Sequence, residues 1–340
     1  MSGKNFFNNA FSHIYVEKDI KDLPVVREVS GNLPSSKFIL IKHYKDVFNR
    51  KRQDYKVQSK SRSLILARNT GNLIFEGSDM CQDHGNSRFF YATSVMNCLF
   101  DCDYCFLKGM YSTGNIVLFV NLEDYEKRIE EMLKDGPMYL SVSYDTDLLA
   151  FQGIADLSSF WIDLARRRKD LTIEFRTKAH ITKFEPMANV IYSFTLSPQS
   201  VISSYEHYTA SLEGRLDSVR RACDTGCNVR LCFDPVLYVR DYLKCYNDFM
   251  DEVIPKVCWD KITDVSVGAF RISKEYIKGL RSCCPMSAVT EFPYVNEGGY
   301  MKMPSDIYKG MRDLLVSRLK EVKDEGKIFC DSDGSIVRDR

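Results

Sequence analysis

The chain has 340 residues, 44% of them hydrophobic, which is enough to bury the core of one large domain or of a domain with extensions. Its formal net charge of +1 is uninformative as a total. The sequence contains neither an apolar run of signal-peptide type nor a run of about eighteen apolar residues that would span a membrane. We therefore expect a cytoplasmic protein whose twelve cysteines stay reduced and serve metal or redox chemistry rather than a disulfide framework.

Positive charge gathers in residues 41–63. This basic segment holds eight Lys or Arg residues against two Asp residues, a net 8 − 2 = +6. Charge runs of this kind are usually solvated surface, and that interpretation stays open. The functional alternative is an arm that contacts phosphates, because Lys and Arg side chains attract a polyanion and release its counterions. The basic residues are Lys42, Lys45, Arg50, Lys51, Arg52, Lys56, Lys60 and Arg62.

From about residue 87 onward, short β-rich runs alternate with amphipathic helical runs. Strands are expected at residues 88–95, 138–144, 171–178, 190–197, 228–236 and 262–272. Helices are expected at residues 121–136, 157–170, 212–226 and 239–257, with a weaker one near 181–188. This order predicts an α/β fold with a parallel sheet, either open or curled into a partial (β/α)6 TIM-like barrel. We expect an N-terminal extension over residues 1–85, the barrel over 86–275 and a C-terminal extension over 276–340.

Three cysteines follow the first expected strand in the stretch "NCLFDCDYCFL". Cys98, Cys102 and Cys105 have the spacing C-x3-C-x2-C, so three thiolates can converge on one soft metal centre. In parallel α/β folds, functional groups gather at the carboxyl ends of the strands, which is where this loop falls. An iron-sulfur cluster of the 4Fe-4S type held by three thiolates leaves one iron open to a small chelating ligand.

Two other interpretations of the three cysteines are weaker. A closed zinc site needs four protein ligands, and only the distant Cys81 or Cys232 would complete it. Simple packing explains poorly why thiols stand in a loop that also carries two Asp residues. A second C-x3-C pair, Cys223 and Cys227, falls on one side of an expected helix, so we expect it to be buried and predict a single cluster.

The cysteine spacing after the first strand of such a fold resembles the radical S-adenosylmethionine superfamily. Nearly the whole chain is similar to the spore photoproduct lyases, through "HIYVEKDIKDLPVVREV", "NRKRQDYKVQSKSRSLILARNTGNLIFEGS", "NCLFDCDYCFL", "FRTK", "FTLSPQSVISSYEHYTASLEGRL" and "FDPVLY" in the same order. The resemblance implies a 4Fe-4S cluster whose open iron binds S-adenosylmethionine, which is cleaved to a 5′-deoxyadenosyl radical. It also implies damaged DNA as substrate, reversal of a thymine dimer to two thymines, and an electron donor such as flavodoxin or ferredoxin.

The resemblance also assigns roles to single residues. Lys178 of "FRTK" and Ser197 of "FTLS" match positions that bind the carboxylate and the ribose of S-adenosylmethionine, and Arg215 is a further polar contact. Tyr104, before the third cysteine, matches an aromatic residue at the cofactor, and Arg271 matches a basic residue that faces the damaged DNA. From the residues alone, Lys178, Arg215 and Arg271 are equally well explained as ion-pair or surface residues and Ser197 as a strand-end cap.

The chain departs from the family at the end of the second expected strand. Tyr144 in "LSVSYDTD" stands where the family has a cysteine that returns a hydrogen atom to the product radical. Phe106 also replaces a tyrosine that often follows the third cysteine, while Tyr104 remains as a catalytic candidate of the same loop. Either Tyr144 donates the hydrogen itself, or the enzyme acts on another nucleic-acid or small-molecule substrate. A rival of a different class is a non-catalytic nucleic-acid-binding iron-sulfur protein.

Overall fold

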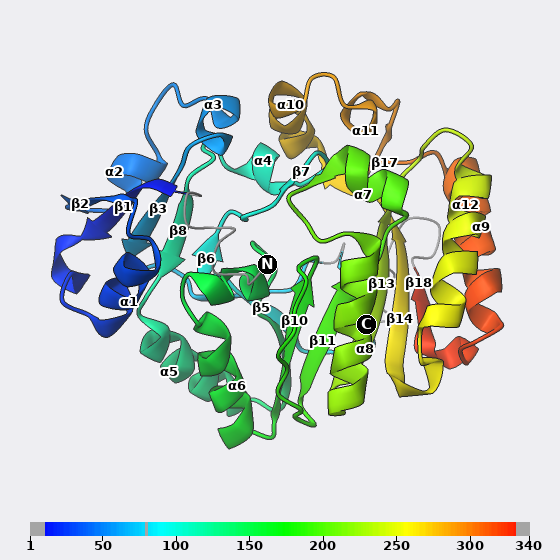
Figure 1. Ribbon diagram of the computed structural model, residues 1–340, viewed down its shortest axis with the longest axis horizontal. Coiled ribbons are helices and arrows are strands. Elements are labelled where there is room, and N and C mark those ends of the chain that lie inside the picture. The colour runs from blue at the N-terminus through cyan, green and yellow to red at the C-terminus, as the bar shows by residue number, and fades with distance from the viewer. Residues whose placement is uncertain (1–10, 79–80, 331–340) are drawn as a thin grey trace.

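The computed structural model describes residues 11–78 and 81–330, and two sheets of mainly parallel strands form its framework (Figure 1). The larger sheet has eight strands. Their order is β18 (Ile328–Cys330), β14 (Ile262–Ala269), β13 (Asn228–Val236), β11 (Val190–Thr195), β10 (Leu171–Thr177), β9 (Met138–Ser141), β5 (Phe89–Ala92) and β4 (Ile74–Glu76). All neighbours are parallel except β4, which is antiparallel to β5.

The six strands expected from the sequence are all present and stand side by side in chain order, from β5 to β14. Neither of the two large sheets closes on itself among the described residues. The mixed α/β class with parallel strands is therefore confirmed, and closure into a partial barrel stays a prediction. Because the strands are parallel, their carboxyl ends lie along one edge, and loops from all six meet there.

A second, five-stranded sheet occupies the N-terminal side of the molecule (Figure 1). Its order is β2 (Lys37–Ile41), β1 (Phe11–Glu17), β3 (Arg62–Ala67), β8 (Ile116–Phe119) and β6 (Val95–Met96). The strands are parallel except β6, which is antiparallel to β8. This sheet combines strands from both sides of the boundary expected at residue 85. The division of the chain into an N-terminal extension, a barrel and a C-terminal extension stays a prediction.

Helices cover the outer face of the large sheet, and shorter helices gather at the edge where its strands end (Figure 1). The longer helices are α1 (Pro24–Asn32), α5 (Leu122–Leu133), α6 (Leu157–Arg167), α8 (Leu212–Thr225), α9 (Tyr242–Val253), α10 (Lys274–Cys283) and α12 (Ser305–Lys320). The short α-helices are α2 (Lys45–Phe48), α3 (Tyr55–Ser59), α4 (Leu107–Met110), α7 (Gln199–Tyr205) and α11 (Ala288–Glu291). The 3-10 helices are η2 (Lys18–Ile20), η3 (Leu148–Gly153), η4 (Ile254–Lys256), η5 (Trp259–Lys261) and η6 (Glu325–Lys327).

Two small sheets complete the structure at this edge. One pairs β7 (Asp101–Cys102) with β12 (Glu206–His207). The other consists of β15 (Arg271–Ser273), β17 (Tyr300–Lys302) and β16 (Val295–Glu297). The first of them joins the cysteine loop to the chain after α7, so this loop is held by backbone hydrogen bonds across about a hundred residues of sequence.

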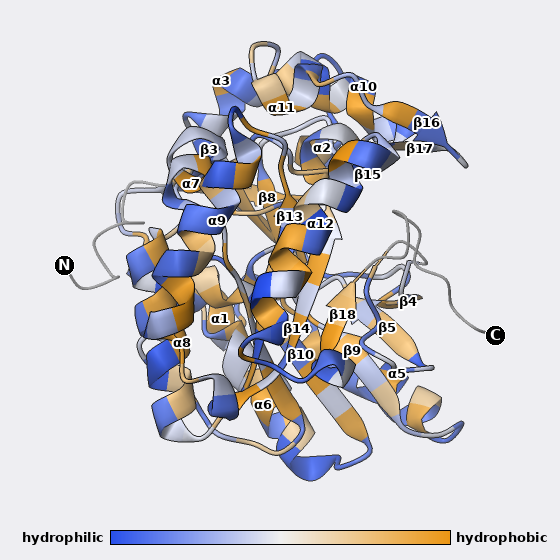
Figure 2. Ribbon diagram, turned by 90° about the vertical axis from the view of Figure 1, so that its right-hand side faces the viewer, coloured by the Kyte–Doolittle hydropathy of each residue, from blue (hydrophilic) through white to orange (hydrophobic). Residues whose placement is uncertain are grey.

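Residue alternation explains how the large sheet packs. In β10, Leu171, Ile173 and Phe175 are fully buried and belong to the hydrophobic core, whereas Glu174 between them is held by polar partners. Glu174 accepts hydrogen bonds from Ser193 and from Arg230, the latter at 3.2 Å. Since successive side chains of a strand point to opposite faces, one face takes the helices and the other carries a buried ionic layer. Figure 2 shows the resulting apolar strands and the two-sided helices, α8 among them.

The weak helix expected near residues 181–188 is wrong, because that stretch is an irregular connection between β10 and β11. Pro186 lies inside it, and proline both lacks the N–H that a helix interior needs and disfavours helical geometry in the residue before it. Of the described helices, none combines the length and the apolar character needed to cross a lipid bilayer.

Candidate functional site

The three cysteines lie in a loop that leaves the N-terminal sheet at β6 and ends at α4. Asn97 starts the loop in the left-handed region, with φ 70°, and its buried Nδ2 donates to the carbonyl oxygens of Thr113 and Asn115, each at 2.8 Å. Arg62 donates from Nη1 to the carbonyl oxygens of Cys98 and Leu99, both at 2.7 Å. The loop is thus fixed by buried donors before it reaches its second cysteine.

Arg62 differs from the other residues of the basic segment. Its side chain is buried under the cysteine loop, whereas the other seven basic residues of the segment are exposed. The segment is therefore solvated along most of its length, and a phosphate-binding role of its exposed members stays a prediction.

The far end of the loop is held by an ion pair. Lys108 in α4 is buried, and its Nζ lies 2.7 Å from Oδ1 of Asp101 and 3.3 Å from Sγ of Cys284 in the segment after α10. Burial lowers the pKa of Lys108, but the charges of Asp101 and Cys284 outweigh this effect and leave it raised. A cation is therefore fixed beside the three thiols.

Cys102 is buried and Cys98 and Cys105 are half-buried, and their thiols are close enough to influence one another's pKa. Burial, with contributions from Asp147 and Cys105, raises the pKa of Cys98 to about 12. Burial also raises the pKa of the Cys102 and Cys105 thiols, while the positive charge of Lys178 opposes the rise at both. Neutral thiols in such surroundings become metal ligands by losing a proton when the metal binds.

A single metal ion and an iron-sulfur cluster place different demands on the three sulfurs. Within the described ranges, no three His, Cys, Asp or Glu side chains converge so as to hold one metal ion. A zinc site needs ligand sulfurs at about 2.3 Å from one common ion. In a 4Fe-4S cluster, by contrast, each thiolate binds a different iron, so the sulfurs need not converge on a single point.

Lys178 brings a positive charge to the same place. It follows β10, and its backbone N–H donates to Oδ2 of Asp147 at 2.6 Å. Its Nζ lies 5.4 Å from the centroid of the Tyr104 ring. Across the described chain, no carboxylate comes within salt-bridge distance of this ammonium group. The interpretation of Lys178 as an ion-pair residue therefore finds no partner among the described residues.

Glu206 joins the other three residues that the resemblance assigned to the cofactor. Tyr104 and Ser197 both donate to Oε1 of Glu206, the latter at 3.0 Å, and Arg215 donates to Oε2. Burial alone would raise the pKa of Glu206, but the charges of Arg215 and Lys178 outweigh it and lower the pKa. Glu206 was not found by sequence reasoning, because a single glutamate in "SYEHYTASLEGRL" has no distinguishing pattern.

Arg215 has no exposed surface. Its other donors bind the carbonyl oxygens of Ala210 and Thr195, both at 3.0 Å, and the hydroxyl of Thr209 at 2.7 Å. In this arrangement Arg215 positions Glu206, and its direct contact with a cofactor stays a prediction. Tyr104 and Ser197 are therefore joined to Glu206, and the Lys178 ammonium lies near the Tyr104 ring, while the assignment of these residues to a cofactor stays a prediction.

Tyr144 lies in the loop after β9 and has an unexpected partner. Sγ of Cys81 donates to Oη of Tyr144 at 3.4 Å. The Tyr144 ring stacks on Tyr91 of β5, with centroids 4.1 Å apart, and lies 5.8 Å from the ring of Phe106. Burial, followed by the proximity of Cys81, raises the pKa of Tyr144, so the phenol stays protonated. Tyr144 thus stands between the cysteine loop and a thiol that sequence reasoning treated only as a distant zinc ligand.

Arg271 is the first residue of β15. Its Nη1 donates to the carbonyl oxygen of Ala269 at 3.2 Å, and its charge acts on the Cys81 thiol together with Arg176. Nη2 of Arg176 is 3.1 Å from Oδ2 of Asp234. The contact of Arg271 with DNA stays a prediction.

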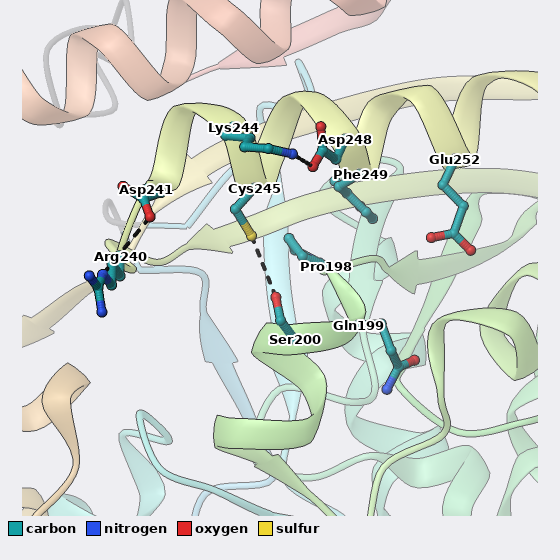
Figure 3. A pocket seen from close by; sticks show the side chains of 10 residues that line it. All are labelled: Pro198, Gln199, Ser200, Arg240, Asp241, Lys244, Cys245, Asp248, Phe249 and Glu252. Atoms are coloured by element: carbon teal, nitrogen blue, oxygen red, sulfur yellow. Dashed lines mark hydrogen bonds and ion pairs between the residues drawn. The ribbon is translucent and has the colours of Figure 1, made fainter.

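A pocket on the outer surface lies apart from these residues. Figure 3 shows it between α7 and α9, where Lys244 pairs with Asp248 and Cys245 faces Ser200. None of the residues assigned to the site by sequence lines this pocket. The chemistry is therefore to be sought at the cysteine loop rather than here.

The comparisons with known proteins define the class of fold. No protein-family model matches the sequence, and no curated protein matches it significantly. Among solved structures, the chain is similar to spore photoproduct lyase complexed with dinucleoside spore photoproduct, with a TM-score of 0.77, 14% identity, and coverage of 95% of this chain and 98% of that one. A cysteine-to-serine variant of that enzyme gives a TM-score of 0.77, and a tyrosine-to-phenylalanine variant gives 0.78, each with 14% identity and coverage of 94% and 98%.

The fold is thus that of the spore photoproduct lyase structures over almost the entire length of both chains, as the sequence resemblance predicted. At this level of identity the likeness establishes the fold. Function has to be argued from the residues of this chain.

Proposed function

We propose that the protein is a radical S-adenosylmethionine enzyme of the spore photoproduct lyase type. In this proposal it reverses a thymine dimer, spore photoproduct, in UV-damaged DNA to two thymines. The observation that carries the proposal is the place of the cysteine loop. On a fold shared with spore photoproduct lyase, Cys98, Cys102 and Cys105 lie in one loop beside Lys178 and Tyr104.

Within this proposal, the three thiolates hold one 4Fe-4S cluster and leave an iron open to S-adenosylmethionine. When bound, the cluster and its ligand supply a carbon-centred radical that abstracts hydrogen from the substrate. Lys178 is suited to bind the carboxylate of the ligand, because its ammonium group is held near the loop without a carboxylate partner in the described chain. Ser197 and Tyr104 are suited to its polar ribose side, where Glu206 orients both hydroxyl groups.

The parallel sheet supplies orientation and exclusion of water, in the manner of a partial barrel over residues 86–275. Arg271 and the exposed members of the basic segment are the proposed contacts for DNA. A lesion that is weakly stacked costs less free energy to draw into a recessed site than an intact base pair. An electron donor such as flavodoxin or ferredoxin, in the cytoplasm, completes the proposal.

Tyr144 favours a second candidate within the same class. Since the expected cysteine is replaced, the protein in this alternative uses the same radical chemistry on another nucleic-acid or small-molecule substrate. The rival of another class remains a nucleic-acid-binding protein in which the cluster is only structural. The two enzyme proposals require cleavage of S-adenosylmethionine by the reduced protein, and the structural rival does not.

The decisive assay uses anaerobically reconstituted protein, a reductant, labelled S-adenosylmethionine and irradiated DNA that contains spore photoproduct. We expect thymine to be released by the parent protein, and none by a Cys102→Ala variant that lacks one cluster ligand. Cleavage of S-adenosylmethionine without loss of the lesion would favour another substrate. A protein that binds DNA but cleaves no S-adenosylmethionine would favour the structural rival.

A further inference from the structure

Three short segments that cover the cysteine loop present large apolar side chains to solvent. Val57 in α3 is 66% exposed, Met110 in α4 is 40% exposed and Met286 after α10 is 95% exposed. These three helices lie along the same edge of the molecule (Figure 1), and Gly109 of α4 packs against Gly279 of α10. A single exposed apolar side chain is ordinary, whereas several around one point mark an interaction site.

Lys108 is the point around which these side chains lie. Its Nζ is 5.7 Å from the centroid of the Tyr55 ring in α3 and 3.3 Å from Sγ of Cys284 after α10. Each of the three exposed apolar residues stands two positions along the chain from Lys108 or from one of these two contacts. The apolar residues of α3, α4 and the end of α10 therefore belong to one surface.

Tyr55 joins this surface to the cysteine loop. Its hydroxyl donates to Oδ1 of Asp101, within the loop, at 3.4 Å. Burial raises the pKa of Tyr55 most, and the charges of Asp101, Cys105 and Cys98 add to the rise, so the thiols lie close to the phenol. Because the ring is half-buried, it reaches from the loop to the exposed side of α3.

The surroundings of the apolar residues are positively charged. Residues 54–60 contain Lys56 and Lys60 against Asp54, and α10 has three Lys or Arg residues against one Glu, a net 5 − 2 = +3. Both lysines of α3 and its end are exposed, and no carboxylate of the described chain lies within salt-bridge distance of either. We call these two lysines and the three apolar residues the cover patch.

We propose that the cover patch docks the acidic one-electron carrier protein that reduces the cluster, with the apolar residues at its centre and the two lysines on its rim. The inference rests on the proposed function, because it needs a cluster to reduce. An apolar centre within a polar rim is the usual composition of a protein interface, and a basic rim favours an acidic partner. The two lysines thereby leave the surface proposed for DNA, and the basic residues of 42–52 remain with it.

The electron transfer balances without chemistry on this chain. One electron passes from the reduced carrier to the oxidised cluster, so the carrier is oxidised by the electron that the cluster gains. No bond of the protein forms or breaks. The cover patch has only to hold the carrier over Tyr55 and Lys108, where the cysteine loop is nearest.

A first experiment tests docking in the cluster-free protein, so its outcome does not depend on catalysis. The protein is mixed with an acidic flavodoxin and a water-soluble carbodiimide, which joins a carboxyl group to an amine that touches it. Peptide mass spectrometry should find flavodoxin joined to Lys56 or Lys60, and not to the exposed Lys134 at the end of α5. Crosslinks spread evenly over the exposed lysines would overturn the inference.

A second experiment compares two reductants of the reconstituted protein. Reduced flavodoxin has to dock, whereas dithionite is small and does not. Lys56→Glu combined with Lys60→Glu should slow cluster reduction by flavodoxin about tenfold at low ionic strength and leave the rate with dithionite unchanged. Met286→Asp should slow the flavodoxin reaction as well, because it removes an apolar contact at the centre of the patch. Arg240→Glu and Leu243→Asp, at the exposed start of α9, are the matched controls and should behave as the parent does.

The outcomes separate the docking surface from the proposed function. Equal flavodoxin rates for the parent and the double lysine variant would overturn the inference, and so would a loss of rate that extends to dithionite. A double variant that binds DNA more weakly but is reduced by flavodoxin at the parental rate would assign the lysines to DNA instead. Fast reduction of the parent by flavodoxin without cleavage of S-adenosylmethionine would leave the docking surface standing and overturn the proposed function.

Discussion

Asp145 offers a quantitative test of the packing near the site, because few interactions offset the cost of burying its carboxyl group. Its side chain is 4% exposed, and Oδ2 accepts a hydrogen bond from Oγ1 of Thr93 at 2.6 Å. No Lys, Arg or His in the described ranges forms a salt bridge with it. Burial accordingly raises the pKa of Asp145 from 3.8 to about 6, even though the Thr93 hydroxyl opposes the rise.

The sign and size of the effect on stability follow from this shift. The folded state takes up the proton more readily than the unfolded chain, so stability falls as pH rises from about 4 to about 6 and stays lowered above that. A shift of roughly two pKa units corresponds to about 3 kcal/mol, of which about 2 kcal/mol develops between pH 4 and pH 8. Asp145→Asn removes the charge and keeps an oxygen for Thr93. We therefore expect it to stabilise the protein by a few kcal/mol at pH 8 and by much less at pH 4.

Urea unfolding of both proteins across this pH range measures the difference directly. Asp135→Asn, on the exposed turn after α5, is the matched control and should give no gain that grows with pH. An Asp145→Asn variant that is less stable than the parent at pH 8, or a gain that does not depend on pH, would refute the reasoning about this carboxyl.

Three further predictions concern the site and its surroundings. Glu206→Gln leaves Arg215 buried without its counter-ion and should lower the free energy of unfolding by about 3–5 kcal/mol, measured by urea unfolding; a loss below 1 kcal/mol would contradict a buried ion pair. Gly109→Ala places a methyl group against the backbone of α10 and should cost about 1–3 kcal/mol, whereas Gly31→Ala in α1, where nothing is near, should not destabilise. Replacing the basic residues 50–52 with Ala should weaken DNA binding and flatten its salt dependence by up to about one unit of slope per lost phosphate contact, and an unchanged slope would assign them to plain solvated surface.

The order of the large sheet could be predicted because its signals are local. Each strand from β5 to β14 is a short apolar run followed by an amphipathic helix or a loop, and the parallel arrangement follows from that alternation. The position of the cysteine loop, which follows β5 and the short strand β6, could be predicted in the same way. The helix expected near Pro186 failed because apolar spacing was given more weight than the proline.

Contacts between distant segments could not be predicted. The pairing of β3 with β8, and that of β7 with β12, join stretches whose own sequences carry no sign of a partner. Arg62 counted as one of eight surface charges in the sequence, and only the fold shows that it holds the carbonyl groups of the cysteine loop. The thiol of Cys81 meets Tyr144 across 63 residues of sequence, so neither residue reveals the other.

The central claim is radical chemistry on S-adenosylmethionine, and the formation of 5′-deoxyadenosine tests it most directly. Protein reconstituted anaerobically with iron and sulfide is mixed with reductant and S-adenosylmethionine, and the nucleoside is quantified by chromatography. The account predicts 5′-deoxyadenosine from the parent, and none from variants in which Cys98, Cys102 or Cys105 is replaced by Ala and which no longer bind iron. A parent protein that carries its full cluster and yet forms no 5′-deoxyadenosine would contradict the account.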